Sequence, residues 1–153
     1  MVDVLDELDV VVTRIGNFGY NECEVCVEGA VTVIQVNGKV YADVKVAQAN
    51  RGWAYGYSQG SRFTHDGAGG SSFAIFLDSR HQYASHREAA ISAKYDLLRC
   101  WEREKRKAPP AAAKEYQKAI DQISQMFAVE PEPEPLPPLP TSTKQPLQYQ
   151  LSL

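Results

Sequence analysis

The segment 30–47, AVTVIQVNGKVYADVKVA, constrains the fold more than any other part of the sequence. Two runs rich in β-branched residues flank Asn37 and Gly38, a pair that supplies the positive φ angles of a two-residue hairpin turn. In the second run, apolar side chains alternate with polar or aromatic ones, so we expect Val40, Ala42, Val44 and Val46 to face inward and Tyr41, Asp43 and Lys45 to face outward. The segment therefore predicts an antiparallel β-hairpin.

Further strands are predicted on both sides of this hairpin. The alternation in NECEVCVEG indicates a half-buried strand over 22–28, and residues 53–58 and 72–78 are typical of two more strands. Between these two, the glycine-rich stretch 60–72, GSRFTHDGAGGSS, favours a long flexible loop. We therefore expect an antiparallel meander of four to five strands that ends at about residue 78.

The hydrophobic period then changes to that of helices. Ser85 and Glu88 form a capping-box pattern at the start of a helix predicted over 86–107. Lys94 falls on its apolar stripe, where its ammonium would have to reach out to solvent. Pro109-Pro110 ends this helix and begins a second one, predicted over 110–128.

The chain is thus expected to be a single α+β domain over 1–128, with two carboxyl-terminal helices after the strands. The proline-rich segment 129–153, which contains EPEPEPLPPLP, is expected to be an extended, disordered tail. No internal repeat is visible in the sequence.

Composition excludes some classes of protein. The 153 residues carry a formal net charge of -3, which argues against a strongly basic nucleic-acid binder. The charge is unevenly distributed: seven acidic residues and one basic residue lie in 1–30, whereas eight basic and four acidic residues lie in 80–107. Three cysteines do not make a disulfide framework, and no apolar run is long enough to span a bilayer. A cytoplasmic protein is expected.

No pattern in the sequence points to catalysis or to a bound metal. Cys23 and Cys26 have the C-x-x-C spacing of metal sites, but on a strand they would face opposite sides, so a zinc site is not expected. The positions of His65, Ser85 and Cys100 in the sequence do not indicate a catalytic site with a nucleophile, a base and a group that orients the base. We therefore expect no enzymatic activity and no cofactor.

Three aromatic residues mark the candidate site. Trp53, Tyr55 and Tyr57 alternate with Ala54 and Gly56, which on a strand places the three rings on one face of the sheet. Because the opposite face would carry only small residues, we expect a helix to pack against that face. The rings would then be left on the outer face as a stacking surface for unpaired bases.

The block 53–107 runs W-x-Y-x-Y, a loop, a strand, then Y-A-S-H-R-E-A and a helix that ends in basic residues. In this outline it resembles the arm-binding domains of phage tyrosine recombinases, and it is also similar to the tryptophan-glycine-arginine domains found beside DNA-repair enzymes. The resemblance implies a three-stranded sheet backed by a helix and laid in or along DNA. Such DNA-binding sheets carry several Arg or Lys residues on the exposed side. The chain departs from this pattern because its Arg51 and Arg62 lie only at the ends of the strand. In general character it also resembles small accessory proteins of phages and plasmids.

Two functions follow as expectations. The first is a nucleic-acid-binding accessory protein of a mobile genetic element, with modest affinity, whose contacts come from the three rings and the basic helix end: Trp53, Tyr55, Tyr57, Arg62, Arg99, Arg103, Lys105, Arg106 and Lys107. The alternative is an inhibitor or adaptor, such as an anti-defence protein, that binds a host protein through the acidic amino-terminal region or the second helix. The apolar seam of that helix, Tyr116, Ile120, Ile123 and Phe127, either folds back on the sheet, docks a partner or forms a homodimer.

Overall fold

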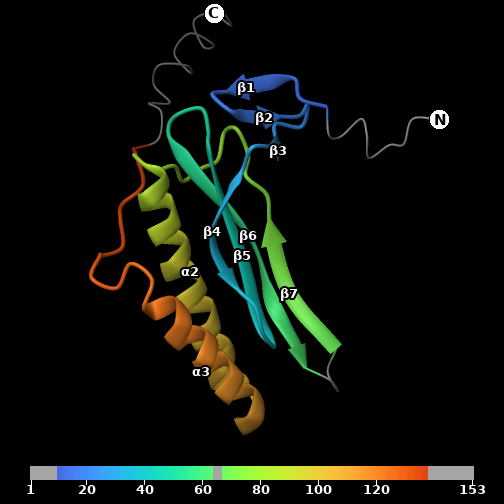
Figure 1. Ribbon diagram of the computed structural model, residues 1–153, viewed down its shortest axis with the longest axis vertical. Helices are drawn as coiled ribbons and strands as arrows, with labels where there is room; N and C mark the ends of the chain where they lie inside the picture. Colours follow the sequence, from blue (N-terminus) through green and yellow to red (C-terminus); the bar gives the residue numbers. More distant parts are fainter. Residues whose placement is uncertain (1–9, 64–66, 138–153) are drawn as a thin grey trace, which may run out of the picture.

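The computed structural model describes residues 10–63 and 67–137. Its main body is a four-stranded antiparallel sheet with the strand order β4-β5-β6-β7, covered on one face by two helices (Figure 1). A small three-stranded sheet with the order β1-β2-β3 lies at one end of the main sheet. The elements are β1 (Thr13–Ile15), β2 (Phe18–Tyr20), β3 (Cys26–Glu28), β4 (Val31–Val36), β5 (Val40–Gln48), β6 (Trp53–Phe63), β7 (Gly67–Phe73), α2 (His86–Lys107) and α3 (Pro110–Ser124).

This architecture confirms the predicted α+β class, with antiparallel strands followed by two helices. The described ranges contain seven strands in two sheets, more than the single meander of four to five strands that the sequence predicts. The first helix has the predicted bounds, and the second ends at Ser124 instead of residue 128.

The hairpin predicted at 30–47 is present as β4 and β5, but its turn differs from the prediction. Strand β4 ends at Val36 and β5 begins at Val40, so the three residues 37–39 connect the strands. Neither Asn37 nor Gly38 has a positive φ angle. Because the connection is longer than two residues and neither Asn37 nor Gly38 is left-handed, the prediction of a two-residue turn is wrong.

The glycine-rich stretch was predicted to be a loop, and this is wrong for most of its length. Strand β6 continues to Phe63, and β7 begins at Gly67 and pairs with it, so that Gly60 lies opposite Gly70 and Ser58 opposite Ser72. Glycine and serine have low strand propensity, but the backbone hydrogen bonds to β6 outweigh it. The predicted strand 72–78 is correspondingly displaced toward the amino terminus.

The segment 22–28 is also different from its prediction, because β3 covers only Cys26–Glu28. Residues 21–25 form a tight turn in which Oδ1 of Asn21 accepts hydrogen bonds from the amides of Cys23 (2.9 Å) and Val25 (3.0 Å). Glu24 adopts a left-handed conformation with φ of 64°. An asparagine that bonds to its own backbone two residues on is a known turn former, so the alternation of this segment reflects a turn as well as a strand.

Polar side-chain contacts stabilise the start of α2 and the end of α3. The Ser85 hydroxyl accepts from the Glu88 amide at 3.1 Å, which confirms Ser85 as the N-cap of α2, and the Glu88 carboxylate reaches back to the same hydroxyl at 3.4 Å. Lys94 does not reach solvent: it is 3% exposed, and its ammonium donates to the carbonyl oxygens of Ser124 and Phe127 at 3.5 and 3.3 Å. These carbonyls lie at and just beyond the carboxyl end of α3, where the helix dipole favours a cation.

Three apolar clusters hold the sheet in place, and the smallest consists of Val46, Tyr83 and Ala89. The first fills the space between the main sheet and the two helices, and the second joins the outer end of the main sheet to the small sheet. The buried members of the first are Ile34, Val36, Val40, Ala42, Val44, Ala93, Leu97, Trp101, Tyr116, Ala119, Ile120 and Ile123. Those of the second are Phe18, Tyr20, Ala47, Ala49, Ala54 and Ile75.

Residues 130–137 contain no helix or strand, as the sequence predicts for the tail, and they run along α2 toward the small sheet (Figure 1). Glu130 and Glu132 form ion pairs with Arg87 and Arg99 of α2. The amide of Leu136 donates to the carbonyl oxygen of Gln82 at 2.6 Å. We call residues 130–137 the strap. The disorder predicted for the rest of the tail, 138–153, concerns residues outside the described ranges.

Candidate nucleic-acid interface

The aromatic residues of β6 face the helices, and the predicted orientation is wrong. Val44 of β5 pairs with Tyr57, and Val46 pairs with Tyr55, so each tyrosine shares a face with a buried valine. Tyr55 and Tyr57 pack against the cluster that contains Leu97 and Trp101 of α2. The rings therefore belong to the helix-covered side, and Ala54 and Gly56 point to the other side.

The small residues are covered by a different segment. Ala54 packs in the cluster with Phe18 and Ile75, and the Cα of Gly56 lies beneath the chain that crosses from β7 to Ile75. A Cβ at Gly56 would be 2.7 Å from the carbonyl oxygen of Phe73. This crossing, and not a helix, is the reason for small residues at these positions.

The three rings are half-buried and in contact with other aromatic rings. Trp53 lies edge-on to Phe18 at 5.4 Å between ring centroids, and Tyr55 stacks on Tyr57 at 6.4 Å. Tyr57 contacts Phe73 edge-on at 4.4 Å. Burial raises the pKa of the Tyr57 hydroxyl. These contacts show that the rings pack within the protein. The stacking of bases on them stays a prediction, but the outward orientation from which it was inferred is wrong.

The side of the main sheet away from the helices is exposed in its half near the β6–β7 hairpin. The side chains there come from β5, β6 and β7: Tyr41, Lys45, Ser58, Arg62 and Ser72, which we call the open sheet face. Lys45, Ser58, Arg62 and Ser72 are exposed, and Tyr41 is partly exposed. The outward orientation predicted for Tyr41, Asp43 and Lys45 is confirmed, because their neighbours Ala42 and Val44 are buried in the helix-side core.

Charge and shape on the open sheet face are suited to an anionic, flat ligand. The guanidinium carbon of Arg62 lies 4.1 Å from the centroid of the Tyr41 ring, in a cation–π contact on this face. Lys45 is a second exposed cation, and Asp43 is the one acidic residue in the four strands. Arg62 was predicted as a nucleic-acid contact, whereas Tyr41 and Lys45 were not. Their outward orientation in the hairpin was the sequence signal that could have identified them.

A pocket of about 320 Å³ opens where the open sheet face meets the crossing chain. Its lining includes Asp43, Lys45, Ser58 and Ser72 from the strands and Cys26 and Ile75 from the segments that roof it. Oδ1 of Asp43 is buried, and no described residue donates a hydrogen bond to it.

The basic end of α2 is less available than its sequence suggests. The Arg99 guanidinium donates to both carboxylate oxygens of Glu132, at 2.8 and 2.9 Å, and to Asp96, and these acceptors raise the pKa of Arg99. Arg103 and Lys107 both lie 3.9 Å from the carboxylate of Glu104. Lys105 donates to the side chain of Gln117, and Arg106 is exposed. The predicted cluster is therefore partly neutralised within the chain.

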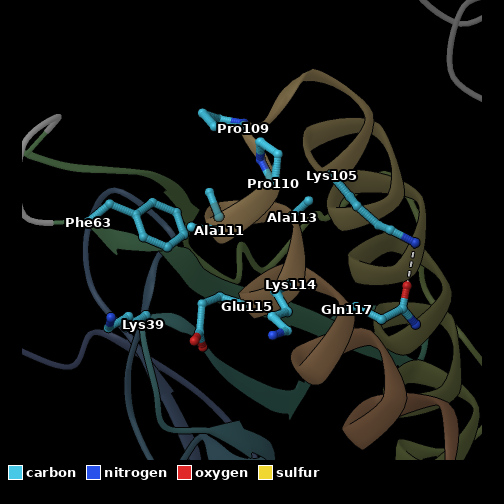
Figure 2. Close-up of a pocket in the computed structure, with 11 residues that line it drawn as sticks. Lys39, Phe63, Lys105, Pro109, Pro110, Ala111, Ala113, Lys114, Glu115 and Gln117 are labelled. Carbon is cyan, nitrogen blue, oxygen red and sulfur yellow. Dashed lines mark hydrogen bonds between the residues drawn. The ribbon is translucent and has the colours of Figure 1, made fainter.

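A second groove lies at this end of the molecule, between the helix hairpin and the end of β6 (Figure 2). It has a volume of about 790 Å³, and proline, alanine and the Phe63 ring provide its apolar walls. Its charged lining comes from different parts of the chain: Lys39 between β4 and β5, Lys105 of α2, and Lys114 and Glu115 of α3. Arg62 and Phe63 are consecutive on β6, so the open sheet face and this groove lie on opposite sides of the same end of the sheet.

The seam of α3 is occupied within the chain. Tyr116, Ile120 and Ile123 are 9%, 5% and 0% exposed and pack against α2 and the sheet. Phe127 lies just after α3, and the guanidinium carbon of Arg87 is 5.0 Å from its ring centroid. Of the alternatives for this seam, the structure shows the one in which it folds back onto the sheet. A homodimer or partner site formed by these buried residues would require that packing to open.

The cysteines do not assemble a metal site in the described part of the chain, where no group of three or more potential ligands occurs. Cys23 is exposed, and Cys26 and Cys100 are partly buried. Burial raises the pKa values of the Cys26 and Cys100 thiols. His65, which was considered for catalysis, lies outside the described residues.

No helix within the described ranges has the length and apolar character needed to cross a bilayer. Comparison of the chain with protein-family models, with curated proteins and with solved structures finds no match. The resemblance of 53–107 to recombinase arm-binding domains therefore stays a prediction.

Proposed function

We propose that this chain is a non-enzymatic protein that binds single-stranded nucleic acid through the open sheet face. The observation that carries the proposal is the contact of Arg62 with the Tyr41 ring, with the exposed cation of Lys45 four residues along β5 on the same face and Asp43 as the one acidic residue between them. Small residues let a base approach the strands closely, and a guanidinium plane on an aromatic ring is a surface on which bases stack.

The proposed affinity is modest and depends on salt. Lys45 and Arg62 together would neutralise about two phosphates, which predicts a slope of about -1.4 for the logarithm of the association constant against the logarithm of salt concentration. The groove lined by Lys39, Lys105 and Lys114 lies at the same end of the sheet and offers further phosphate contacts to a longer strand. Arg106 is exposed near the carboxyl end of α2 and stays a predicted contact.

The test is a matched pair of charge reversals. Binding of a fluorescent 12-nucleotide oligothymidine is measured by anisotropy at several salt concentrations for the unmodified protein, Lys45→Glu and Lys118→Glu. Lys118 is an exposed lysine of α3 that pairs with Glu115. We expect Lys45→Glu to weaken binding about tenfold at low salt and Lys118→Glu to weaken it less than about twofold. Equal effects of the two reversals, or affinity that does not change with salt, would refute the proposal.

A protein-binding inhibitor or adaptor is the second candidate, and one observation favours it. Strand β7 has a neighbour on only one side in the main sheet, and Phe73 and the nearby Phe76 are 45% and 43% exposed. A free strand edge beside exposed aromatic rings is suited to the addition of a strand from a partner. A complex that survives nuclease treatment and is lost with Phe73→Glu would favour this candidate.

A further inference from the structure

Strand β7 is an edge of the main sheet, and its sequence does not protect that edge. Among the described residues, the order β4-β5-β6-β7 leaves one side of β7 without a neighbouring strand. The strand, GAGGSSF, contains no charged residue and no proline, and its pairing with β6 is regular from Gly67 to Phe73. Charges, prolines and bulges are the usual features that keep an edge strand from pairing with a further segment. The outer side of β7 is therefore suited to one more strand.

The sheet beside this edge is apolar on the side that faces the helices. Phe73 pairs with Tyr57 and so lies on the helix side, yet it is 45% exposed. Phe76, which follows β7, is 43% exposed. A groove of about 230 Å³, which we call the aromatic groove, opens here, and its lining includes Tyr55, Phe73, Phe76, Ser79 and Arg80. Exposed aromatic rings next to a free strand edge indicate a place that a further segment covers.

One segment of the chain outside the described ranges has the sequence of a strand. Residues 147–153, LQYQLSL, which we call the tail segment, alternate apolar and polar side chains over their whole length. On a strand, the leucines and the tyrosine would share one face: Leu147, Tyr149, Leu151 and Leu153. The glutamines and the serine would share the other face. The tail segment carries no charge, and it has the same length as β7.

The two faces of the tail segment match the two sides of the sheet at β7. Its apolar face suits the helix side, where it would cover Phe73 and the aromatic groove. Its glutamines and serine would then continue the open sheet face next to Ser72, which is exposed on that side. A shift by one residue would place the leucines beside Ser72 in water, so one of the two orientations is favoured.

The chain leaves the described part of the molecule beside the aromatic groove. The Arg51 guanidinium donates to the carbonyl oxygen of Pro137 at 2.9 Å. The same group donates to the carbonyl oxygens of Ser79 and Arg80, which line the groove. From Pro137, the nine residues 138–146 reach about 30 Å when extended. Because β7 runs from the β6–β7 hairpin toward this pole, a segment that enters from here would be antiparallel to β7 (Figure 1).

We propose that the tail segment of the same chain adds to β7 as an antiparallel edge strand and covers the aromatic groove with Tyr149 and Leu151. A short linker gives a tethered segment an effective concentration on the order of millimolar, which favours this occupant over a second copy of the chain. The inference does not depend on nucleic-acid binding. It implies that a partner strand at β7 would first have to displace the tail segment.

The test measures amide hydrogen exchange in β7 of the full-length chain by NMR. In a strand with one neighbour, every second amide points away from that neighbour and exchanges with solvent. We expect these outward amides to exchange about tenfold more slowly in the unmodified protein than in Tyr149→Asp/Leu151→Asp, because a buried carboxylate does not suit an aromatic groove. The control, Gln148→Asp/Gln150→Asp, carries the same charges on the other face and should keep the slow exchange. Equal loss of protection in the two double variants would overturn the assigned faces.

Contacts in the unmodified protein identify the occupant without any substitution. We expect nuclear Overhauser effects between the Phe73 ring and the methyl groups of Leu151. A mixture of ¹³C-labelled and unlabelled protein separates contacts within one chain from contacts between two. Contacts between chains alone, together with a doubled mass in light scattering, would assign the edge to a second copy and overturn the inference. Fast exchange of the outward amides in the unmodified protein would overturn it as well and would leave β7 free for a partner.

Discussion

The indole N–H of Trp101 on α2 donates a buried hydrogen bond of 3.0 Å to Oε1 of Gln59 on β6. The amide nitrogen of Gln59 in turn donates to the hydroxyl of Ser71 on β7 at 2.9 Å. One polar side chain thus joins the first helix to two strands on the face that also carries Tyr55 and Tyr57. The contact fixes which side of β6 the helix covers.

Replacement of Gln59 by alanine should leave the Trp101 indole N–H buried without an acceptor. We expect the free energy of unfolding to fall by about 1–3 kcal/mol, the usual cost of such a group. Urea denaturation measures this change. Gln35→Ala, at an exposed position on β4, is the control and should cost less than about 0.5 kcal/mol. Similar losses for the two variants would contradict the assigned contact.

Gly29 and Gly38 should respond differently to substitution by alanine. Gly29 has φ of +92°, and a Cβ there would lie 2.4 Å from the carbonyl oxygen of Asn17. Gly38 has no positive φ, and the nearest atom to its Cβ would be the Val40 carbonyl oxygen at 3.4 Å. Gly29→Ala should therefore lower the free energy of unfolding by about 1–3 kcal/mol, and Gly38→Ala by less than about 1 kcal/mol. Thermal or chemical denaturation of the two variants checks the order.

The three cysteines should react with iodoacetamide at different rates. Cys23 is exposed, whereas Cys26 and Cys100 are partly buried and burial raises the pKa values of their thiols. A raised pKa lowers the fraction of thiolate near neutral pH, and that fraction grows as the pH rises through the raised value. Alkylation should therefore be fastest at Cys23 at pH 7 and should accelerate at Cys26 and Cys100 as the pH is raised. Peptide mass spectrometry resolves the three sites, and uniform rates at pH 7 would contradict the burial of these thiols.

Removal of the strap should destabilise the domain. Its contacts include the ion pairs of Glu130 and Glu132 and the Leu136 side chain, which lies over Gly52, where a Cβ would be 2.6 Å from Leu136 Cδ1. The exposed ion pairs contribute little, so most of the effect should come from the backbone hydrogen bonds and Leu136. A chain that ends at residue 129 should lose about 1–2 kcal/mol of unfolding free energy relative to one that ends at 137. Equal stability of the two chains would show that the strap does not contribute.

Patterns with a local physical cause were predictable from the sequence. The capping hydroxyl of Ser85 and the bounds of α2 follow from residues that lie next to one another, and the alternation of β5 follows from its valines. The glycine-rich strand β7 was not predictable in this way, because its stability comes from pairing with β6 and not from its own side chains. The contacts of Lys94 with the end of α3 depend on how two helices pack, which the apolar stripe alone does not specify.

In the candidate site, too, some features were predictable from local sequence and others depend on how distant segments pair. The faces of β6 could be assigned only with the register to β5, which pairs Tyr57 with Val44 through the turn at 49–52. In that register the tyrosines lie beside inward-facing valines and must also face inward. Ala54 and Gly56 then face the other side, where the chain between β7 and Ile75 passes over them. The outward-facing residues of β5 were predictable from its alternation. The contact of Tyr41 with Arg62 was not, because it requires β6 to extend to Phe63 through a glycine-rich stretch that favours a loop.

Arg51 determines where the chain leaves the domain. Its guanidinium donates to the carbonyl oxygens of Ser79, Arg80 and Pro137, at 3.2, 3.0 and 2.9 Å, and so holds the last described residue beside the turn between β5 and β6. This turn is at the opposite end of the main sheet from the β6–β7 hairpin (Figure 1). A dye, affinity tag or surface linker joined after residue 137 would therefore start from the far pole of the molecule.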